Sequence, residues 1–69
     1  MKITVNGKQV ESSNNIKVSQ LLVEQKVQTP EYVSVELNGQ ILDRSEFDTK
    51  YVQPDDAVEF LYFMGGGGQ

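Results

Sequence analysis

The sequence contains no cysteine and no histidine among its 69 residues. The absence of cysteine excludes disulfides and thiolate catalysis, and the absence of both residue types removes the usual ligands of a structural zinc ion. The chain also lacks the side chain whose ordinary pKa lies closest to neutral pH. These absences argue against an enzyme or a metalloprotein that works alone.

Long apolar runs and clusters of basic residues are also missing. No stretch approaches the roughly 18 apolar residues of a membrane span, and the first residues do not form a signal segment. We therefore expect a cytoplasmic protein that binds no membrane. Six scattered Lys and Arg stand against ten Asp and Glu, so the net charge is -4 and we do not expect nucleic acid as a partner. The acidity serves solubility, steering toward a basic groove on a partner protein, or both.

The length is that of a single small domain. A domain of this size has a small core and little room for a cavity that holds substrate, cofactor and catalytic groups together. Any chemistry is therefore expected at an edge of the fold or at a chain terminus.

The first segment of the chain predicts a β-hairpin. Residues 2–5 alternate polar and apolar side chains, and residues 8–11 can return beside them. The Asn6-Gly7 pair between them tolerates positive φ at both central positions of a tight turn.

A helix is predicted over residues 17–26. The polar residues 12–15 offer side chains that can cap its beginning, and Pro30 follows its end. Apolar residues recur at the spacing of one helical face, at Val18, Leu21 and Leu22.

The second half predicts two further strands and an irregular connection. Residues 32–37 alternate as a strand, and a second Asn-Gly pair turns the chain toward a short strand at Ile41 and Leu42. Residues 44–51 predict an irregular connection or a short helical turn that folds Phe47 and Tyr51 inward. Residues 57–63 read as the last and most buried strand.

Together these elements predict an α+β fold. One mixed sheet of four to five strands would carry one main helix on one face, with the first and last strands side by side and parallel. The expected organisation is a folded domain over residues 1–64 and a flexible glycine-rich tail over residues 65–69.

The tail is the one low-complexity stretch of the sequence. Gly65, Gly66, Gly67 and Gly68 carry no Cβ, so this segment can lie extended in a channel too narrow for ordinary side chains. Such a tail suits presentation of a chain end to the active site of another protein. The alternative is a frayed terminus or a linker.

An ordered set of segments resembles one known family. The segments are Met1–Lys8, Val18–Leu22, Val33–Gly39, Arg44, Pro54–Asp56 and Val58–Phe60, followed by the terminal glycines. Together they resemble the ThiS-like sulfur carriers of thiamine biosynthesis, within the ubiquitin-like β-grasp proteins that also include MoaD-like carriers. The resemblance implies a β-grasp fold over nearly the whole chain.

The resemblance also implies a mechanism that needs partner enzymes. An E1-like adenylyltransferase of the ThiF type would use ATP to adenylate the carboxylate of a terminal glycine. A sulfur donor such as a cysteine desulfurase would then displace AMP, and the resulting thiocarboxylate would pass its sulfur to a thiazole synthase of the ThiG type. Adenylation supplies the leaving group that a free carboxylate lacks. The carrier would bind no cofactor and have no catalytic residue of its own.

The chain departs from the family pattern at two places. Gln69 follows the glycines, whereas only a terminal glycine carboxylate fits the scheme, so we hypothesise that a protease removes Gln69 and exposes Gly68 for activation. Asp55-Asp56 stands where the family usually has Gly-Asp, for which we expect a small cost in stability. This acidic pair alone lacks the further ligands that a metal site requires.

Two other positions have open interpretations. The run from Phe60 to Met64 is apolar on both faces, so Leu61, Phe63 and Met64 either dock a partner or belong to the core. Arg44 matches a family position, and we interpret it as part of a surface ion pair rather than as a site residue.

The sequence leaves three functional classes to compare. A sulfur carrier is the leading one, and the pathway served could also be that of molybdopterin or a sulfur amino acid. A ubiquitin-like binding or modifier module is the second. An enzyme acting alone is disfavoured, because no nucleophile with a base, phosphate loop or ligand cluster is present.

Overall fold

The structure is a computed structural model that describes residues 1–62. Its elements in chain order are β1 (Lys2–Val5), β2 (Lys8–Glu11), α1 (Val18–Glu24), β3 (Val33–Leu37), β4 (Gln40–Ile41), the 3-10 helix η1 (Arg44–Glu46) and β5 (Ala57–Tyr62). Residues 63–69 lie outside the described part, and with them the predictions for Phe63, Met64, the glycines and Gln69, and the domain boundary after residue 64.

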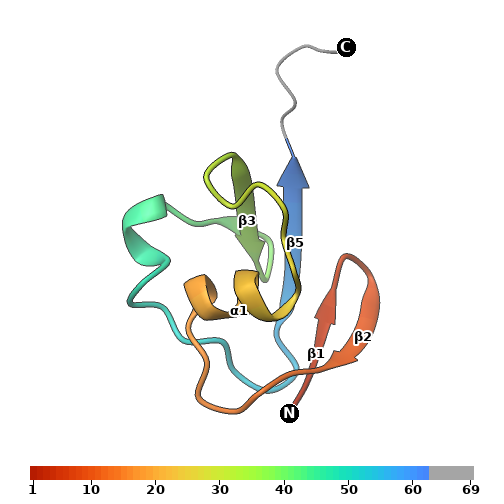
Figure 1. Cartoon of the computed structure of the whole chain (residues 1–69). Helices are drawn as coiled ribbons and strands as arrows, with labels where there is room; N and C mark the ends of the chain where they lie inside the picture. Colours follow the sequence, from red (N-terminus) through yellow and green to blue (C-terminus); the bar gives the residue numbers. More distant parts are fainter. Residues whose placement is uncertain (63–69) are drawn as a thin grey trace.

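The strands form one mixed sheet in the order β2-β1-β5-β3-β4 (Figure 1). β1 and β5 run parallel, while β1 with β2, β3 with β4 and β3 with β5 are antiparallel. The predicted parallel pairing of the first and last strands is confirmed, with α1 in the crossover between them. This arrangement places β5, the last described element, at the centre of the sheet.

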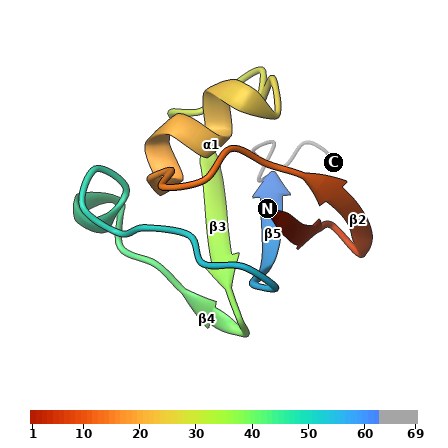
Figure 2. The same ribbon diagram turned by 90° about the horizontal axis from the view of Figure 1, so that it is seen from below.

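One face of the sheet carries the core, and α1 lies across it (Figures 1 and 2). Alternation in β3 and β5 sends every second side chain toward the helix. Full burial of a valine, leucine or isoleucine side chain stabilises the fold by about 1.5–3 kcal/mol relative to leaving it exposed. The buried hydrophobic residues are Ile3, Val5, Ile16, Val18, Leu21, Leu22, Val33, Val35, Leu37, Phe47, Val52, Val58 and Phe60.

The helix is two residues shorter than predicted at its C-terminal end, and its beginning is capped differently. The side chain of Gln20 accepts a hydrogen bond of 2.9 Å from the backbone N–H of Lys17, so residues 12–15 do not supply the cap. Ser12 and Ser13 instead donate their hydroxyls to the carboxylate of Glu24, at 2.7 and 2.6 Å. These bonds lower the pKa of Glu24 and tie the end of α1 to the end of β2.

The connection between β4 and β5 closes a second part of the core. Its helical turn is η1, and Phe47 is buried as predicted. The prediction for Tyr51 is wrong, because its ring is 42% exposed and stacks against the ammonium of Lys17. Val52 takes the buried place, since its N–H binds the carbonyl of Ile16 and directs its side chain to the core.

The turn before β5 places an aspartate in the left-handed region. Asp55 has φ of 69°, which glycine adopts without strain and aspartate tolerates better than most residues. The neighbouring carboxylate of Asp56 closes the turn by accepting the N–H of Gln53 at 2.8 Å. The expectation of a small stability cost here has its physical basis in this φ value.

Candidate functional site: the carboxyl end of β5

The glycine-rich end of the sequence lies just beyond β5. On one side, β5 pairs with β3 through Tyr62, which lies opposite Val33. On the other side, the register with β1 ends where Val5 lies opposite Val58. The strand is therefore held by β3 up to its last described residue, whereas its pairing with β1 stops four residues earlier.

Partly exposed apolar and aromatic side chains lie at this end of the sheet. Leu61 is half-buried on the face away from α1, opposite Ser34. Tyr62 is 46% exposed, and Tyr32, which precedes its partner residue in β3, is 68% exposed. The exposure of Leu61 leaves it available for contact, and its docking role stays a prediction.

Arg44 fixes the start of β3 beside this end of β5. Its guanidinium donates to the carbonyl oxygens of Pro30 and Val33 at 2.9 and 2.7 Å, and it lies 5.3 Å from the centre of the Phe47 ring. These contacts give Arg44 a structural role in place of the ion pair that we expected. A pattern of charges could not reveal it, because its partners are backbone carbonyls.

The face of the sheet away from α1 carries two different cross-strand charge pairs. Lys2 of β1 lies opposite Glu11 of β2, which is a favourable pair. Glu36 of β3 lies opposite Glu59 of β5, which places two carboxylates side by side on the central strands. This face therefore carries two opposed carboxylates in the middle of β5, while Ser34 and Leu61 lie closer to the end of the strand.

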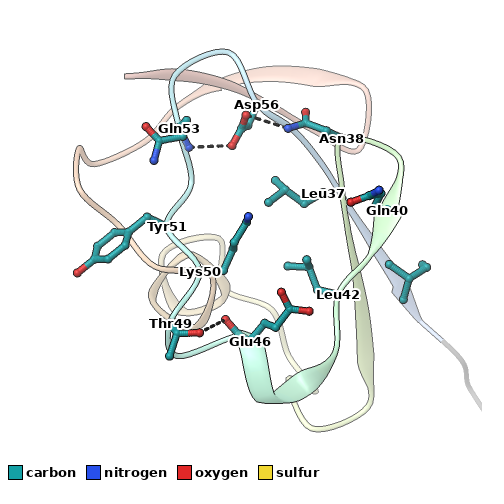
Figure 3. Close-up of a pocket in the computed structure, with 11 residues that line it drawn as sticks. Leu37, Asn38, Gln40, Leu42, Glu46, Thr49, Lys50, Tyr51, Gln53 and Asp56 are labelled. Carbon is teal, nitrogen blue, oxygen red and sulfur yellow. Dashed lines mark hydrogen bonds between the residues drawn. The ribbon is translucent and has the colours of Figure 1, made fainter.

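The polar hollow in Figure 3 is the other feature with convergent side chains, and its volume is about 450 Å³. It lies between β4 and residues 46–56, and Figure 3 shows Lys50 among the residues that line it. Asp56 is committed to structure, because its carboxylate accepts hydrogen bonds from Asn38 and Gln53 at 2.9 and 2.8 Å. Within residues 1–62, no three His, Cys, Asp or Glu side chains gather as they would around a metal ion.

In the described part of the chain, no helix has the length and apolar character needed to cross a bilayer.

Comparison with known proteins decides the family. The model of the ThiS family matches residues 3–67, which is nearly the whole chain. The chain belongs to the ThiS family. No curated protein matches it.

Two solved structures of a ThiS-family member show the same fold. A crystal structure of thiamine biosynthesis protein ThiS from Geobacter metallireducens is 54% identical, with a TM-score of 0.85, and the match covers 97% of this chain and 100% of that one. A solution structure of a thiamine biosynthesis protein from the same organism is 52% identical, with a TM-score of 0.79, and covers 100% of this chain and 91% of that one. The β-grasp fold implied by the resemblance is thereby confirmed.

Proposed function

We propose that the chain is a sulfur carrier of thiamine biosynthesis and that it works through its glycine-rich end. The supporting observation is the ThiS-family match, which extends through Gly65, Gly66 and Gly67. The thiamine biosynthesis proteins of Geobacter metallireducens, at 52 and 54% identity, support the choice of pathway. The carrier itself contributes a carboxylate and a docking surface, and partner enzymes carry out the chemistry.

The proposed reaction begins with removal of Gln69 by a protease, which leaves the carboxylate of Gly68 at the end of the chain. An E1-like adenylyltransferase then joins this carboxylate to AMP from ATP. A sulfur donor such as a cysteine desulfurase supplies a persulfide whose outer sulfur attacks the acyl carbon, and AMP leaves. A thiol reductant then cleaves the resulting acyl disulfide and leaves the thiocarboxylate on the chain. The thiocarboxylate delivers its sulfur to a thiazole synthase.

Placement of the glycines after β5 supports this scheme physically. β5 is the central strand of a folded body, so its end is anchored while the following glycines add no side chains that would obstruct a narrow channel. The absence of cysteine and histidine from the sequence is compatible with the scheme, because the sulfur and the proton-transfer groups come from partners. Leu61, with Phe63 and Met64 beyond it, would contact the partner beside the channel.

Adenylation in a purified system tests this function. Chains that end at Gly67, Gly68 and Gln69 would each be incubated with ATP and the E1-like adenylyltransferase of the same host, and pyrophosphate release would be measured. We expect release with one or both glycine-ended chains and none with the chain that ends at Gln69. Equal release from the Gln69 chain would remove the trimming step, and no release from any chain would contradict the carrier function.

A further inference from the structure

The side chain of Asn6 continues the ladder between β1 and β5 after the backbone of β1 has turned away. The N–H of Thr4 donates to the carbonyl of Asp56 at 2.9 Å, and the N–H of Asn6 donates to the carbonyl of Val58 at 2.9 Å. The next bond, at 2.8 Å, runs from the N–H of Phe60 to the side-chain oxygen Oδ1 of Asn6. Bonds between parallel strands are evenly spaced, so Oδ1 stands where the next backbone carbonyl would accept.

The geometry of the turn explains why a side chain takes this place. Asn6 has φ of 51° and Gly7 has φ of 82°, the positive values of a two-residue hairpin turn, so the backbone bends away from β5 at Asn6. The short amide side chain still reaches the strand. The sequence identifies Asn6 as a turn residue, but it does not reveal this second role.

The other Asn-Gly turn provides a matched comparison. Asn38 has φ of 50° and Gly39 has φ of 86°. The Oδ1 of Asn38 accepts the N–H of Ala57 at 2.8 Å, and its backbone N–H donates to the carbonyl of the same residue at 2.7 Å. Both turns therefore hold β5 through an asparagine oxygen. Asn38 holds the first residue of β5, Ala57, whereas Asn6 holds Phe60 in the second half of the strand.

We propose that Asn6 is a positioning residue for activation of the chain end. Among the described residues, β3 alone pairs its backbone with β5 beyond Val58, so Asn6 supplies the hold on the opposite side at Phe60. Phe60 lies five positions before Gly65, at the start of the glycine-rich end. Hydrogen bonds on both sides of β5 restrict the direction of the strand that precedes the glycine-rich end. This inference rests on the proposed carrier function.

The expected effect appears in KM rather than in kcat. If the end of β5 is held on one side only, a smaller fraction of chains presents its end in the direction that the adenylyltransferase accepts, and apparent affinity falls by that fraction. The rate of adenylation of a chain end that is already bound in the active site does not change, so kcat stays the same. Loss of one hydrogen bond of ordinary net strength corresponds to about a three- to tenfold effect.

The test compares three variants in a chain that ends at Gly68. Asn6→Gly keeps a residue that adopts positive φ and removes the acceptor oxygen, while Asn6→Asp keeps an acceptor. Asn38→Gly is the control, because it removes an asparagine acceptor from the same kind of turn at the other end of β5, together with the bond that the Asn38 amide donates to Asp56. The measurements are KM and kcat for ATP-dependent pyrophosphate release by the E1-like adenylyltransferase, and amide hydrogen exchange at Phe60 and Ala57.

We expect Asn6→Gly to raise KM about three- to tenfold with kcat unchanged and to speed exchange at Phe60 by a similar factor. Asn6→Asp should restore KM, and Asn38→Gly should speed exchange at Ala57 without raising KM. Equal KM values for the two glycine variants, or no rescue by Asn6→Asp, would overturn the inference. If the unsubstituted chain is not adenylated, the proposed carrier function fails, and the role of Asn6 in activation fails with it. If Asn6→Gly leaves hydrogen exchange at Phe60 unchanged, only the inference that Asn6 holds β5 is refuted, and the carrier function is unaffected.

Discussion

The two faces of the sheet differ in what determines their residues. The face beneath α1 carries the buried apolar side chains of the core, which alternate with the side chains of the other face along β1, β3 and β5. The other face holds Thr4, Ser34, Leu61 and the opposed pair of Glu36 and Glu59. Stability requirements therefore account for the residues of the covered face, whereas the open face contains a pair of like charges that stability alone would disfavour.

The largest expected loss of stability comes from a substitution in the core that covers the face of the sheet beneath α1. Leu21 lies on the buried face of α1, so Leu21→Ala should lower the free energy of unfolding by about 2–4 kcal/mol through lost burial and the cavity it leaves. Val23, two residues along the same helix and 78% exposed, is the control, and Val23→Ala should change stability by less than about 0.5 kcal/mol. Urea unfolding measures both, and similar losses would contradict the assigned faces.

A smaller effect is expected where η1 and the start of β3 meet. Lysine offers a single ammonium in place of the planar group with which Arg44 reaches both carbonyls, so Arg44→Lys should cost about 1–2 kcal/mol. Thermal unfolding monitored by circular dichroism would measure the cost. A lysine variant as stable as the original chain would show that charge alone matters at this position.

Local patterns in the sequence account for most of this fold. Alternation in residues 2–5 and 33–37 and the two Asn-Gly pairs predict both hairpins, and the spacing of Val18, Leu21 and Leu22 predicts the helix. The pattern fails over residues 44–52, where Val52 rather than Tyr51 enters the core. That choice depends on backbone bonds with the chain near Ile16, which lies far away in sequence and leaves no local signal.

On the open face, a substitution is expected to stabilise the protein. Glu59→Gln removes one of two opposed carboxylates, so it should raise the Tm by about 1–4 °C at low salt. The gain should shrink as salt screens the repulsion. Glu31→Gln, which removes an exposed charge outside the strands, is the control and should leave the Tm nearly unchanged. A loss of stability in Glu59→Gln would mean that the pair is not repulsive.

The smallest effect concerns Glu24 and depends on pH. Its pKa is lowered from the ordinary value of 4.5, chiefly by the hydroxyls of Ser13 and Ser12. A carboxylate with a depressed pKa adds stability above its unfolded pKa and loses it as the pH falls through the folded pKa. The advantage of the original chain over Glu24→Gln should therefore disappear in acid below about pH 4.5. Urea unfolding at pH 7 and pH 3 measures it, and a constant difference would contradict the assignment.

Part of the candidate site can be predicted from the sequence, and the rest depends on contacts that form only in the folded chain. The glycine run and the family resemblance point to the chain end from residue order alone. The hold of Asn6 on Phe60 spans 54 positions of sequence, and the bonds of Arg44 go to backbone carbonyls. Neither leaves a local pattern, because each depends on how distant segments meet in the sheet.

Intact-protein mass spectrometry of the chain purified from its own host would show whether the chain end is processed and carries sulfur. We predict a chain that has lost Gln69 and in which sulfur replaces one oxygen of the terminal carboxylate, and the mass also tells whether the end is Gly67 or Gly68. A chain that keeps Gln69 and carries no sulfur during growth without thiamine would contradict the proposed carrier function and favour a ubiquitin-like binding module.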